Sequence, residues 1–513
     1  MLSDEELAAT RPRRLSPMPL SRLVDWMSRF YGEDPQLTAP RGDDPDLSGV
    51  SLSSQRILPG DLYAALPGAR AHGASYAGQA VAAGAVAVLT DPPGADLCAG
   101  LGVPVVEVPT PRRLLGRLAG HVYGDPAAAL TLIGVTGTQG KTTTTRLLEG
   151  ALESAGITAA AIGTVGTRIA GRDLRTALTT PEAPDLHGLF ARMLEDGVTA
   201  CAMEVSSHAL VMGRVDGVVF DVAVFLNLGR DHLDFHRDVE DYYAAKASLF
   251  TPERATAALV NLDDEHGRRL ARETRLPVTT FALDDPDADW RATQIELTAE
   301  GSSFTVSGPD TEFRAHCPLP GDFNVANTLA ALAASALAGF DPVAVADGVA
   351  AGGGVPGRLE RVDGGQDFVV VVDYAHKPDA VAAALRTLRP LTTGRLIVVL
   401  GAGGDRDTGK RPLMGELAAE LADVFVVTDD NPRTEDAAAI RAAVLAGARR
   451  AGSSAQVLEI GERRRAIREA LDLAHPGDIV LVAGKGHETG QEIDGVVHPF
   501  DDRVVVREEL ARR

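Results

Sequence analysis

Residues 131–156 read TLIGVTGTQGKTTTTRLLEGALESAG and decide the fold of this chain. A short apolar strand at 132–135 leads into a Gly/Thr loop, and a helix begins in the threonine run. In that order of elements, glycines let backbone N–H groups approach phosphate oxygens at a helix N-terminus. Lys141 would reach the terminal phosphates and the Thr142 hydroxyl would bind Mg²⁺. The stretch predicts a nucleotide-binding α/β domain.

The loop departs in one place from the general pattern G-x-x-x-x-G-K-[ST], because Val135 stands where the first glycine would be. The alternative is a Gly-rich turn that ends in a capped helix and holds no ligand. The preceding strand and the threonine run favour a phosphate loop. Its expected residues are Gly137, Thr138, Gln139, Gly140, Lys141, Thr142 and Thr143.

Composition bounds the class of protein. The chain has 513 residues, enough for about three domains, and a formal net charge of −21. Nucleic-acid backbones and anionic membranes attract basic faces, so an acidic chain argues against both as non-specific partners. Apolar residues make up 45% of the chain, which supports large cores. We expect small-molecule substrates and no nucleic-acid partner.

Cysteine usage and hydropathy predict a cytoplasmic protein. Cys98, Cys201 and Cys317 lie far apart without C-x-x-C spacing, which predicts neither a disulfide framework nor a zinc knuckle. The first residues, MLSDEELAATRPRR, lack the apolar core of a signal peptide. No apolar run approaches the roughly 18 residues of a membrane span.

An α/β rhythm continues on both sides of the phosphate loop. Residues 1–128 predict a small α/β domain behind a polar, Pro-rich leader, 129–352 the nucleotide-binding domain, and 353–513 a third domain after a Gly-rich hinge. Further buried strands of the middle domain are expected at 200–203, 218–225 and 257–261. Strands of the last domain end at Leu400, Thr428 and Ala483. Polar loops follow these ends, where open parallel sheets bind ligands.

Acidic and histidine side chains follow two buried strands of the middle domain. Glu204 follows CAM, and Asp231, His232, Asp234 and His236 follow VAVFLNLG. Such ligands at the rim of a parallel sheet can hold a divalent cation against nucleotide phosphates. The i, i+4 spacing of His232 and His236 would suggest zinc, but the glutamate of an H-E-x-x-H motif is missing. Rim residues that only cap loops are the other alternative.

Lysine is rare in this chain, with five lysines beside 45 arginines. A lysine that remains indicates a position where a compact or modifiable amine is needed. Lys246 lies in YYAAKASLF, on a predicted helix among small and aromatic residues, which favours a buried amine with a function over a solvated side chain. The other lysines are Lys141, Lys377, Lys410 and Lys485.

A series of motifs resembles, in order, the motifs of the Mur ligases, and the match runs from about residue 51 to residue 503. They are TGTQGKTTTT, EVSSHAL, NLGRDHLDFH, YYAAKASLF, GDFNVANTLAALAA, VPGRLE, DYAHKPDA, GGDRDTGKRPLM, DNPRTED and GKGHE. The resemblance is closest to members that add 2,6-diaminopimelate. It implies a uridine-nucleotide-binding N-terminal domain, a central P-loop ATPase with a parallel sheet and a Rossmann-like C-terminal domain.

The resemblance implies ATP-driven amide formation in peptidoglycan precursor synthesis, and hence a part in cell-wall biogenesis, cell shape and cell division. The D-glutamyl γ-carboxylate of UDP-MurNAc-L-Ala-D-Glu would attack the γ-phosphorus of ATP. The amine of meso-diaminopimelate would then displace phosphate from the acyl phosphate. Lys141 and Mg²⁺ would neutralise the charge of the anionic partners. Closure of the last domain over the middle one is the expected gate.

Site residues follow from positions that match the family's motifs. Glu204 and His232, with Thr142, match Mg²⁺ ligands, and Lys246 matches a lysine that CO₂ carbamylates in relatives, which turns a cation into an anion. Around ATP the matches are Asn324, Asn327, Arg358, Asp373 and His376. For the UDP-MurNAc-dipeptide they are Leu52, Ser54, Ala69, Arg70, Ala71, Thr179, Thr180, Ser206 and Arg214. For diaminopimelate they are Arg406, Asp430, Asn431, Pro432, Arg433, Gly484 and Glu488.

Specificity for the amino acid is assigned to Arg433 of the DNPR motif. Its guanidinium would grip the second carboxylate of diaminopimelate bidentately, and L-lysine, the alternative substrate at the same step, lacks that carboxylate. Three residues depart from the usual family motifs. Met212 replaces a common glutamine, which puts one substrate contact in doubt, Gln139 replaces a frequent asparagine, and Lys377 a frequent neutral residue.

Rival classes remain at this stage. A sister ligase could add L-lysine or use a folate-like substrate, although DNPR and the uridine motif speak against it. A nucleotide-dependent switch would share the phosphate loop but would not need the GGDRD, DNPR and GKGHE loops. A metal-dependent hydrolase would be built on His208, His232 and His236.

Overall fold

The computed structural model describes residues 9–31, 35–38, 42–68, 70–176, 178–229, 231–232 and 235–513. The chain forms two compact units. Unit 1 contains residues 1–291 and 330–348, and unit 2 contains residues 292–329 and 349–513. The chain passes from one unit to the other within strand β16 (Trp290–Thr298) and within helices α11 (Asp322–Leu337) and α12 (Pro342–Ala351).

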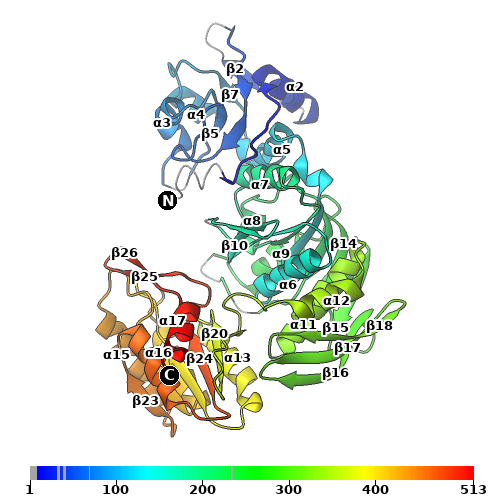
Figure 1. The fold of residues 1–513 in the computed structure, drawn as a ribbon. Helices are drawn as coiled ribbons and strands as arrows, with labels where there is room; N and C mark the ends of the chain where they lie inside the picture. Colours follow the sequence, from blue (N-terminus) through cyan, green and yellow to red (C-terminus); the bar gives the residue numbers. More distant parts are fainter. Residues whose placement is uncertain are drawn as a thin grey trace. The chain divides into compact units, whose positions relative to one another are not determined.

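A five-stranded sheet opens unit 1 and is coloured blue in Figure 1. Its order is β2-β7-β6-β5-β4, with β4 to β7 parallel and β2 antiparallel to β7. Alternate residues face opposite sides, so Leu62 packs with α2 and α5 whereas Tyr63 packs with α3. The elements are α2 (Leu20–Tyr31), β2 (Gln36–Thr38), β4 (Gly49–Ser51), β5 (Asp61–Ala64), α3 (Ala77–Ala82), β6 (Ala87–Thr90), α4 (Pro92–Leu97), β7 (Val105–Glu107) and α5 (Pro111–Val122).

From residue 9 onward, the polar, Pro-rich segment at the start of the chain packs against the rest of unit 1. Arg11 is buried, donates to Asp61 at 3.3 Å and contacts the Tyr123 hydroxyl. The backbone N–H of Arg14 donates to Glu195 at 2.7 Å. The segment that contains Arg11 and Arg14 therefore connects the first sheet to helix α7 (Ala183–Glu195).

A second sheet of unit 1 carries the phosphate loop. Its order is β11-β10-β9-β12-β8-β13-β14-β15, and the first residues of β16 (Trp290–Thr298) pair with β15. Strands β9, β12, β8, β13, β14 and β15 are parallel, which confirms the buried strands expected from the sequence. Their bounds are β8 (Thr131–Thr136), β9 (Ala159–Gly163), β12 (Ala200–Glu204), β13 (Phe220–Phe225), β14 (Ala255–Asn261) and β15 (Val278–Ala282).

Strand β8 lies between β12 and β13, so the carboxyl ends of these three strands are neighbours at one sheet edge. Helices α7 and α9 share one apolar cluster with Leu132 and Phe220 of the sheet. The phosphate loop, Glu204 and the turn after β13 are therefore brought to one edge. The remaining elements are α6 (Lys141–Ser154), β10 (Gly166–Ile169), β11 (Arg172–Leu174), α8 (Ser207–Val211), α9 (Val239–Ala247) and α10 (Glu265–Glu273).

Unit 2 contains a six-stranded sheet of order β19-β20-β24-β21-β22-β23, parallel except for β19. Helices α13, α14 and α15 cover one face, and α16 and α17 cover the other. Strands β21 and β24 end at Leu400 and Ala483, as expected, and β22 ends at Val427, one residue early. The sheet strands are β19 (Glu360–Arg361), β20 (Val369–Asp373), β21 (Leu396–Leu400), β22 (Val424–Val427), β23 (Gln456–Glu459) and β24 (Ile479–Ala483).

Two antiparallel hairpins complete unit 2. Strands β17 (Gly301–Gly308) and β18 (Thr311–Cys317) pair, as do β25 (Gly490–Ile493) and β26 (Val496–Pro499). The helices of this unit are α13 (Pro378–Leu388), α14 (Lys410–Leu421), α15 (Ala437–Arg450), α16 (Arg463–Leu473) and α17 (Asp502–Leu510).

Candidate active site

The phosphate loop joins β8 to α6, as expected. Gly137 and Gly140 have φ of 157° and 86°, values that glycine adopts readily. The Lys141 amine donates to the carbonyls of Gly137 and Thr138, at 2.7 and 3.1 Å. The loop is held from β13 by Asn227, whose Oδ1 accepts the backbone N–H of Thr138 and of residue 139, at 3.1 and 2.9 Å.

Glu204 is 1% exposed and lies directly beside the phosphate loop. Its Oε1 accepts the Thr142 hydroxyl and the backbone N–H of Thr164, both at 2.8 Å. Its Oε2 accepts the Thr164 hydroxyl at 3.1 Å. A Cβ on Gly163 would overlap the carboxylate. Gly163 and Thr164 thus fix the carboxylate, and no motif in the sequence had indicated them.

Lys246 is buried, as its helix context predicted, with 1% of its surface exposed. Its amine donates to the Gly137 carbonyl at 2.8 Å and lies 4.6 Å from the centre of the Tyr242 ring. Burial, reinforced by the Lys141 cation, holds the pKa of this amine well below its usual range. An amine with a depressed pKa is neutral in a larger fraction of molecules, which makes it more nucleophilic.

The histidines near the loop form an aromatic cluster with Phe235. His208 stacks on Phe235 and meets His232 edge-on, with ring centroids 4.0 and 4.8 Å apart. His236 is buried and its Nε2 lies 2.9 Å from the Ser207 hydroxyl. Across the described residues, no group of three His, Cys, Asp or Glu side chains is placed to hold a metal ion. Asp234 lies outside the described residues.

The residues expected at the dipeptide end form one network beside Glu204. The Thr180 hydroxyl donates to the Glu204 carbonyl at 2.8 Å and accepts the Ser206 N–H at 3.2 Å. Arg214 donates to the Thr180 carbonyl at 3.4 Å. The Thr179 hydroxyl lies 3.2 Å from that of Thr164. The structure therefore brings this expected set next to the phosphate loop.

The residues expected at the uridine end lie in loops after β4 and β5. Ser54 donates to Gln79 at 3.4 Å, and Leu52 is half-buried against the core of the first sheet. Arg70 and Ala71 are exposed. Ala69 lies outside the described residues.

Five residues expected around the nucleotide belong to unit 2. Asp373, at the end of β20, accepts the backbone N–H of Leu359 and Ala375 at 2.7 and 2.8 Å, while burial raises its pKa. The Arg358 guanidinium lies over the Tyr374 ring, 4.9 Å from its centre. Burial also lowers the pKa of His376. The remaining pair lies on α11, where the Asn327 amide donates to Asn324 at 3.2 Å.

The residues expected to bind the amino acid gather at the carboxyl ends of β22 and β24. Asn431 donates to Glu488 at 2.9 Å, and a Cβ on Gly484 would lie 2.5 Å from the Asp430 carboxylate. Arg433 has a left-handed φ of 55° and donates to the Gly404 carbonyl at 2.6 Å. Pro432 is buried beside it, and Arg406 is exposed on the loop after β21.

Two further charged side chains join this cluster, and the sequence analysis assigned neither of them to the site. The Lys485 amine is completely buried and donates to Asn431 and Glu488, at 2.9 and 3.2 Å. Glu492 of β25 pairs with Arg433 at 3.3 Å. The rarity of lysine could have indicated Lys485, which lies within the GKGHE motif.

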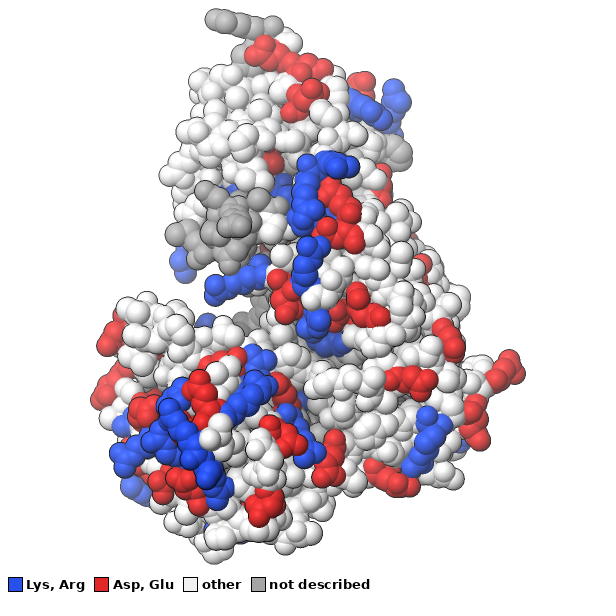
Figure 2. Space-filling view, viewed as in Figure 1, with Lys and Arg blue, Asp and Glu red and all other residues white. Residues whose placement is uncertain are grey.

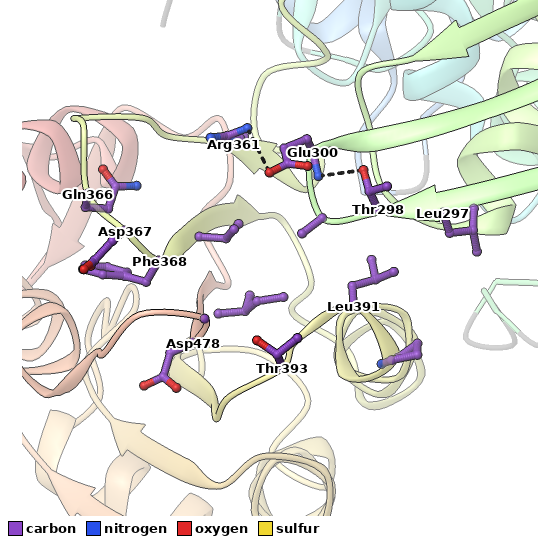
Figure 3. Close-up of a pocket in the computed structure, with 15 residues that line it drawn as sticks. Leu297, Thr298, Glu300, Arg361, Gln366, Asp367, Phe368, Leu391, Thr393 and Asp478 are labelled. Carbon is purple, nitrogen blue, oxygen red and sulfur yellow. Dashed lines mark hydrogen bonds and ion pairs between the residues drawn. The ribbon is translucent and has the colours of Figure 1, made fainter.

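A separate pocket of about 460 Å³ opens at the amino ends of β20 and β24 (Figure 3). Phe368 and Asp478 line it, together with Glu300 and Arg361, whose charged groups are 4.0 Å apart. It lies at the opposite end of the sheet from Arg433, so it takes no part in the site described above.

On the face drawn in Figure 2, acidic side chains lie among the basic ones, so the basic side chains form no continuous positive surface there. Within the part of the chain that the structure describes, no helix has the length and apolar character needed to cross a membrane.

Fold and site together define a nucleotide-binding α/β protein, with a phosphate loop at the carboxyl ends of a largely parallel sheet. Sequence models of the Mur ligase family match three stretches: the family's catalytic domain at residues 46–123, its middle domain at 135–335 and its glutamate ligase domain at 357–486. The chain belongs to the Mur ligase family. The resemblance noted in the motifs and the expected fold class are thereby confirmed.

Particular relatives are similar over nearly the whole chain. The UDP-N-acetylmuramoyl-L-alanyl-D-glutamate–2,6-diaminopimelate ligase of Streptomyces avermitilis is 54% identical, with 98% of each chain covered. The protein of the same name from Corynebacterium glutamicum is 49% identical, with 97% of this chain and 98% of that one covered. A solved structure of a ligase with this name is 36% identical, has a TM-score of 0.65, and covers 91% of this chain and 95% of its own.

Proposed function

We propose that this chain is an ATP-dependent ligase that adds meso-2,6-diaminopimelate to the D-glutamyl γ-carboxylate of UDP-MurNAc-L-Ala-D-Glu in peptidoglycan precursor synthesis. The observation that carries the proposal is the 54% identity to a ligase of that name across 98% of both chains. A phosphate loop beside a buried carboxylate in unit 1, and an arginine-bearing pocket in unit 2, support it.

Residues 1–128 would hold the uridine end of the substrate, residues 129–352 the ATP, and residues 353–513 the amino acid. The enzyme would work in the cytoplasm, where thiols stay reduced, which suits three buried cysteines without disulfides. Its product would serve cell-wall biogenesis, and through it cell shape and division.

In the nucleotide half, Lys141 would exchange its two loop carbonyls for phosphate oxygens and so neutralise their charge. Mg²⁺ fits the oxygen-rich corner of Thr142 and Glu204, because this ion takes few protein ligands and completes its shell with phosphate and water. His232 would contribute from the turn after β13. The bound ion would stabilise charge on the transferring phosphoryl group.

A carbamate on Lys246 is consistent with the chemistry of this buried amine. Only a neutral amine reacts with CO₂, and the pKa of Lys246 is depressed by burial. The carbamate would place a negative charge where a lysine otherwise stands, next to the carbonyl of Gly137 in the phosphate loop. Ser206 and Arg214 would orient the γ-carboxylate for its attack on the γ-phosphorus.

In the amino-acid half, Arg433 would bind the second carboxylate of diaminopimelate. Gly404 and Glu492 already fix two nitrogens of its guanidinium, so little side-chain freedom is lost on binding. The carboxylate of Glu488 would attract the second amine. The amine that reacts would be left to attack the acyl phosphate.

The test is ADP release from ATP, measured with UDP-MurNAc-L-Ala-D-Glu and either meso-diaminopimelate or L-lysine. We expect release to require both substrates and to favour diaminopimelate by up to about 10⁴ in kcat/KM, because lysine has no second carboxylate for Arg433 to bind. Equal use of L-lysine would favour the alternative substrate. The comparison with L-lysine is needed because a 44% identical protein of Leifsonia xyli is named UDP-N-acetylmuramyl-tripeptide synthetase, and that name does not specify the added amino acid.

A further inference from the structure

Glu182 occupies the N-cap position of α7, but its side chain does not cap the helix. Caps are usually short polar side chains that accept a backbone N–H of the first turn. Glu182 directs its carboxylate elsewhere, toward two arginines from different parts of unit 1. It lies two residues after Thr180, beyond Pro181, and Thr179 and Thr180 were expected to bind the dipeptide end of the substrate.

One carboxylate oxygen of Glu182 holds Arg214. The Oε1 atom accepts the Nε–H of Arg214 at 2.8 Å, and the two side chains are 19% and 14% exposed. Partial burial protects this pair from the solvent screening that weakens surface ion pairs. With Nε fixed, the plane of the guanidinium is set, and its terminal nitrogens face Thr180 and Met212.

The second oxygen reaches the first domain. The Oε2 atom accepts NH1 of Arg112 at 3.0 Å, and Arg112 lies in the first turn of α5. A neighbouring pair, Arg56 with Asp185 at 2.8 Å, also joins that domain to α7 but does not touch Arg214. These two ion pairs cross the same junction, and of the two the pair of Glu182 with Arg112 is the one that contacts a residue of the expected site.

We propose that Glu182 is a positioning residue for the UDP-MurNAc-dipeptide substrate. It orients the Arg214 guanidinium toward the acidic end of the substrate and ties it through Arg112 to the domain that would hold the uridine end. The inference rests on the proposed function. The substrate is long and charged at both ends, so a fixed spacing between its two anchor points would reduce the entropy lost on binding.

The experiment varies each substrate in turn for the full-length chain and for Glu182→Gln, which keeps the size of the side chain and removes its charge. We expect KM for UDP-MurNAc-L-Ala-D-Glu to rise about tenfold, as for loss of one charge-assisted hydrogen bond, with KM for ATP and diaminopimelate nearly unchanged. Arg112→Gln is expected to give a smaller rise, and the double variant no further rise beyond that of Glu182→Gln.

Asp185→Asn is the matched control, because it breaks the neighbouring ion pair alone. We expect its KM values to equal those of the unaltered chain, and thermal melting keeps folding defects apart from binding. An equal rise of KM in Asp185→Asn would mean that domain docking, and not Arg214, is affected, and would overturn the positioning role. Unchanged KM in Glu182→Gln would do the same. Absence of ligation by the unaltered chain would instead overturn the proposed function.

Discussion

Lys246 occupies a buried position at which lysine and arginine would behave differently. An arginine there would keep its charge in almost any environment, whereas a buried lysine can lose its proton. Because the pKa of Lys246 is depressed, the neutral amine is populated at lower pH than in an exposed lysine. The position thus favours the amine form that reacts with CO₂.

Lys246→Arg is therefore expected to lower kcat for ligation by about 100-fold or more, on the scale of losing one preorganised charge in an active site, with ATP binding retained. Incubation with ¹³C-labelled bicarbonate should give a carbamate signal by ¹³C NMR in the unaltered chain and none in the variant. A variant that ligates at the normal rate would remove the carbamate from the mechanism.

Arg433→Ala tests the amino-acid pocket at the same scale. The φ of 55° places this arginine in a region that non-glycine residues rarely adopt, and the backbone pairing of Arg433 with Ile493 holds it there. We expect KM for diaminopimelate to rise by up to about 10³-fold, because the second carboxylate loses its bidentate partner. Equilibrium binding of ATP, measured by calorimetry, should stay within about twofold. Unchanged incorporation of diaminopimelate would sink the assignment of Arg433.

Lys246 could be predicted from the sequence because its rarity and its neighbours on one helix are local signals. The roles of Glu182, Thr164 and Asn227 could not be predicted from the sequence. Each acts through a partner that is distant in sequence, such as Arg112 for Glu182 or Thr138 for Asn227. Only the fold brings such pairs together, and their residue types are ordinary in loops.

Among elements, the buried parallel strands were predictable because both of their faces are covered, so they read as continuous apolar runs. The antiparallel strands were missed. β18 has two buried positions among its seven residues, and β11 is a three-residue strand with two exposed positions. Polar, exposed strands carry little hydrophobic signal, and only their pairing in the fold defines them.

Helices α14 and α15 cross closely because a glycine of each helix faces the backbone of the other helix. A Cβ on Gly447 would overlap the Pro412 carbonyl, and one on Gly415 would overlap that of Val444. We expect Gly447→Ala to lower the opening free energy of these helices by about 1–3 kcal/mol, through overpacking. Hydrogen exchange of peptides from α14 and α15 measures this locally, which suits a chain of several domains.

Gly150 in α6 is the control for that substitution, because a Cβ there meets nothing within 4 Å. Gly150→Ala should raise the opening free energy of α6 by about 0.5–1 kcal/mol, since alanine is the better helix former. If Gly447→Ala stabilised its helix equally, the close crossing would not constrain the helix pair.

For the whole molecule, the proposed chemistry divides between the units. The phosphate loop, Glu204 and Lys246 belong to unit 1, whereas Asp373 and Arg433 belong to unit 2. An acyl phosphate and an amine react only when they meet within about 3–3.5 Å. Neither unit holds the full set of expected residues, and the sequence motifs, which are local, identify each half separately.

We therefore expect the distance between the units to respond to substrates. The three native cysteines are buried, so dyes can be attached selectively through Ser154→Cys on unit 1 and Ser453→Cys on unit 2, both at exposed positions. The distribution of single-molecule energy-transfer efficiencies should shift and become narrower when ATP and UDP-MurNAc-L-Ala-D-Glu bind together. The change should be smaller with either ligand alone, because bound ligands favour the state in which both units contact them. Arg433→Ala should leave this response in place, since it removes only the amino-acid contact. If the distribution of transfer efficiencies stayed unchanged with every substrate while the labelled enzyme still ligated, the units would need no rearrangement to complete the site.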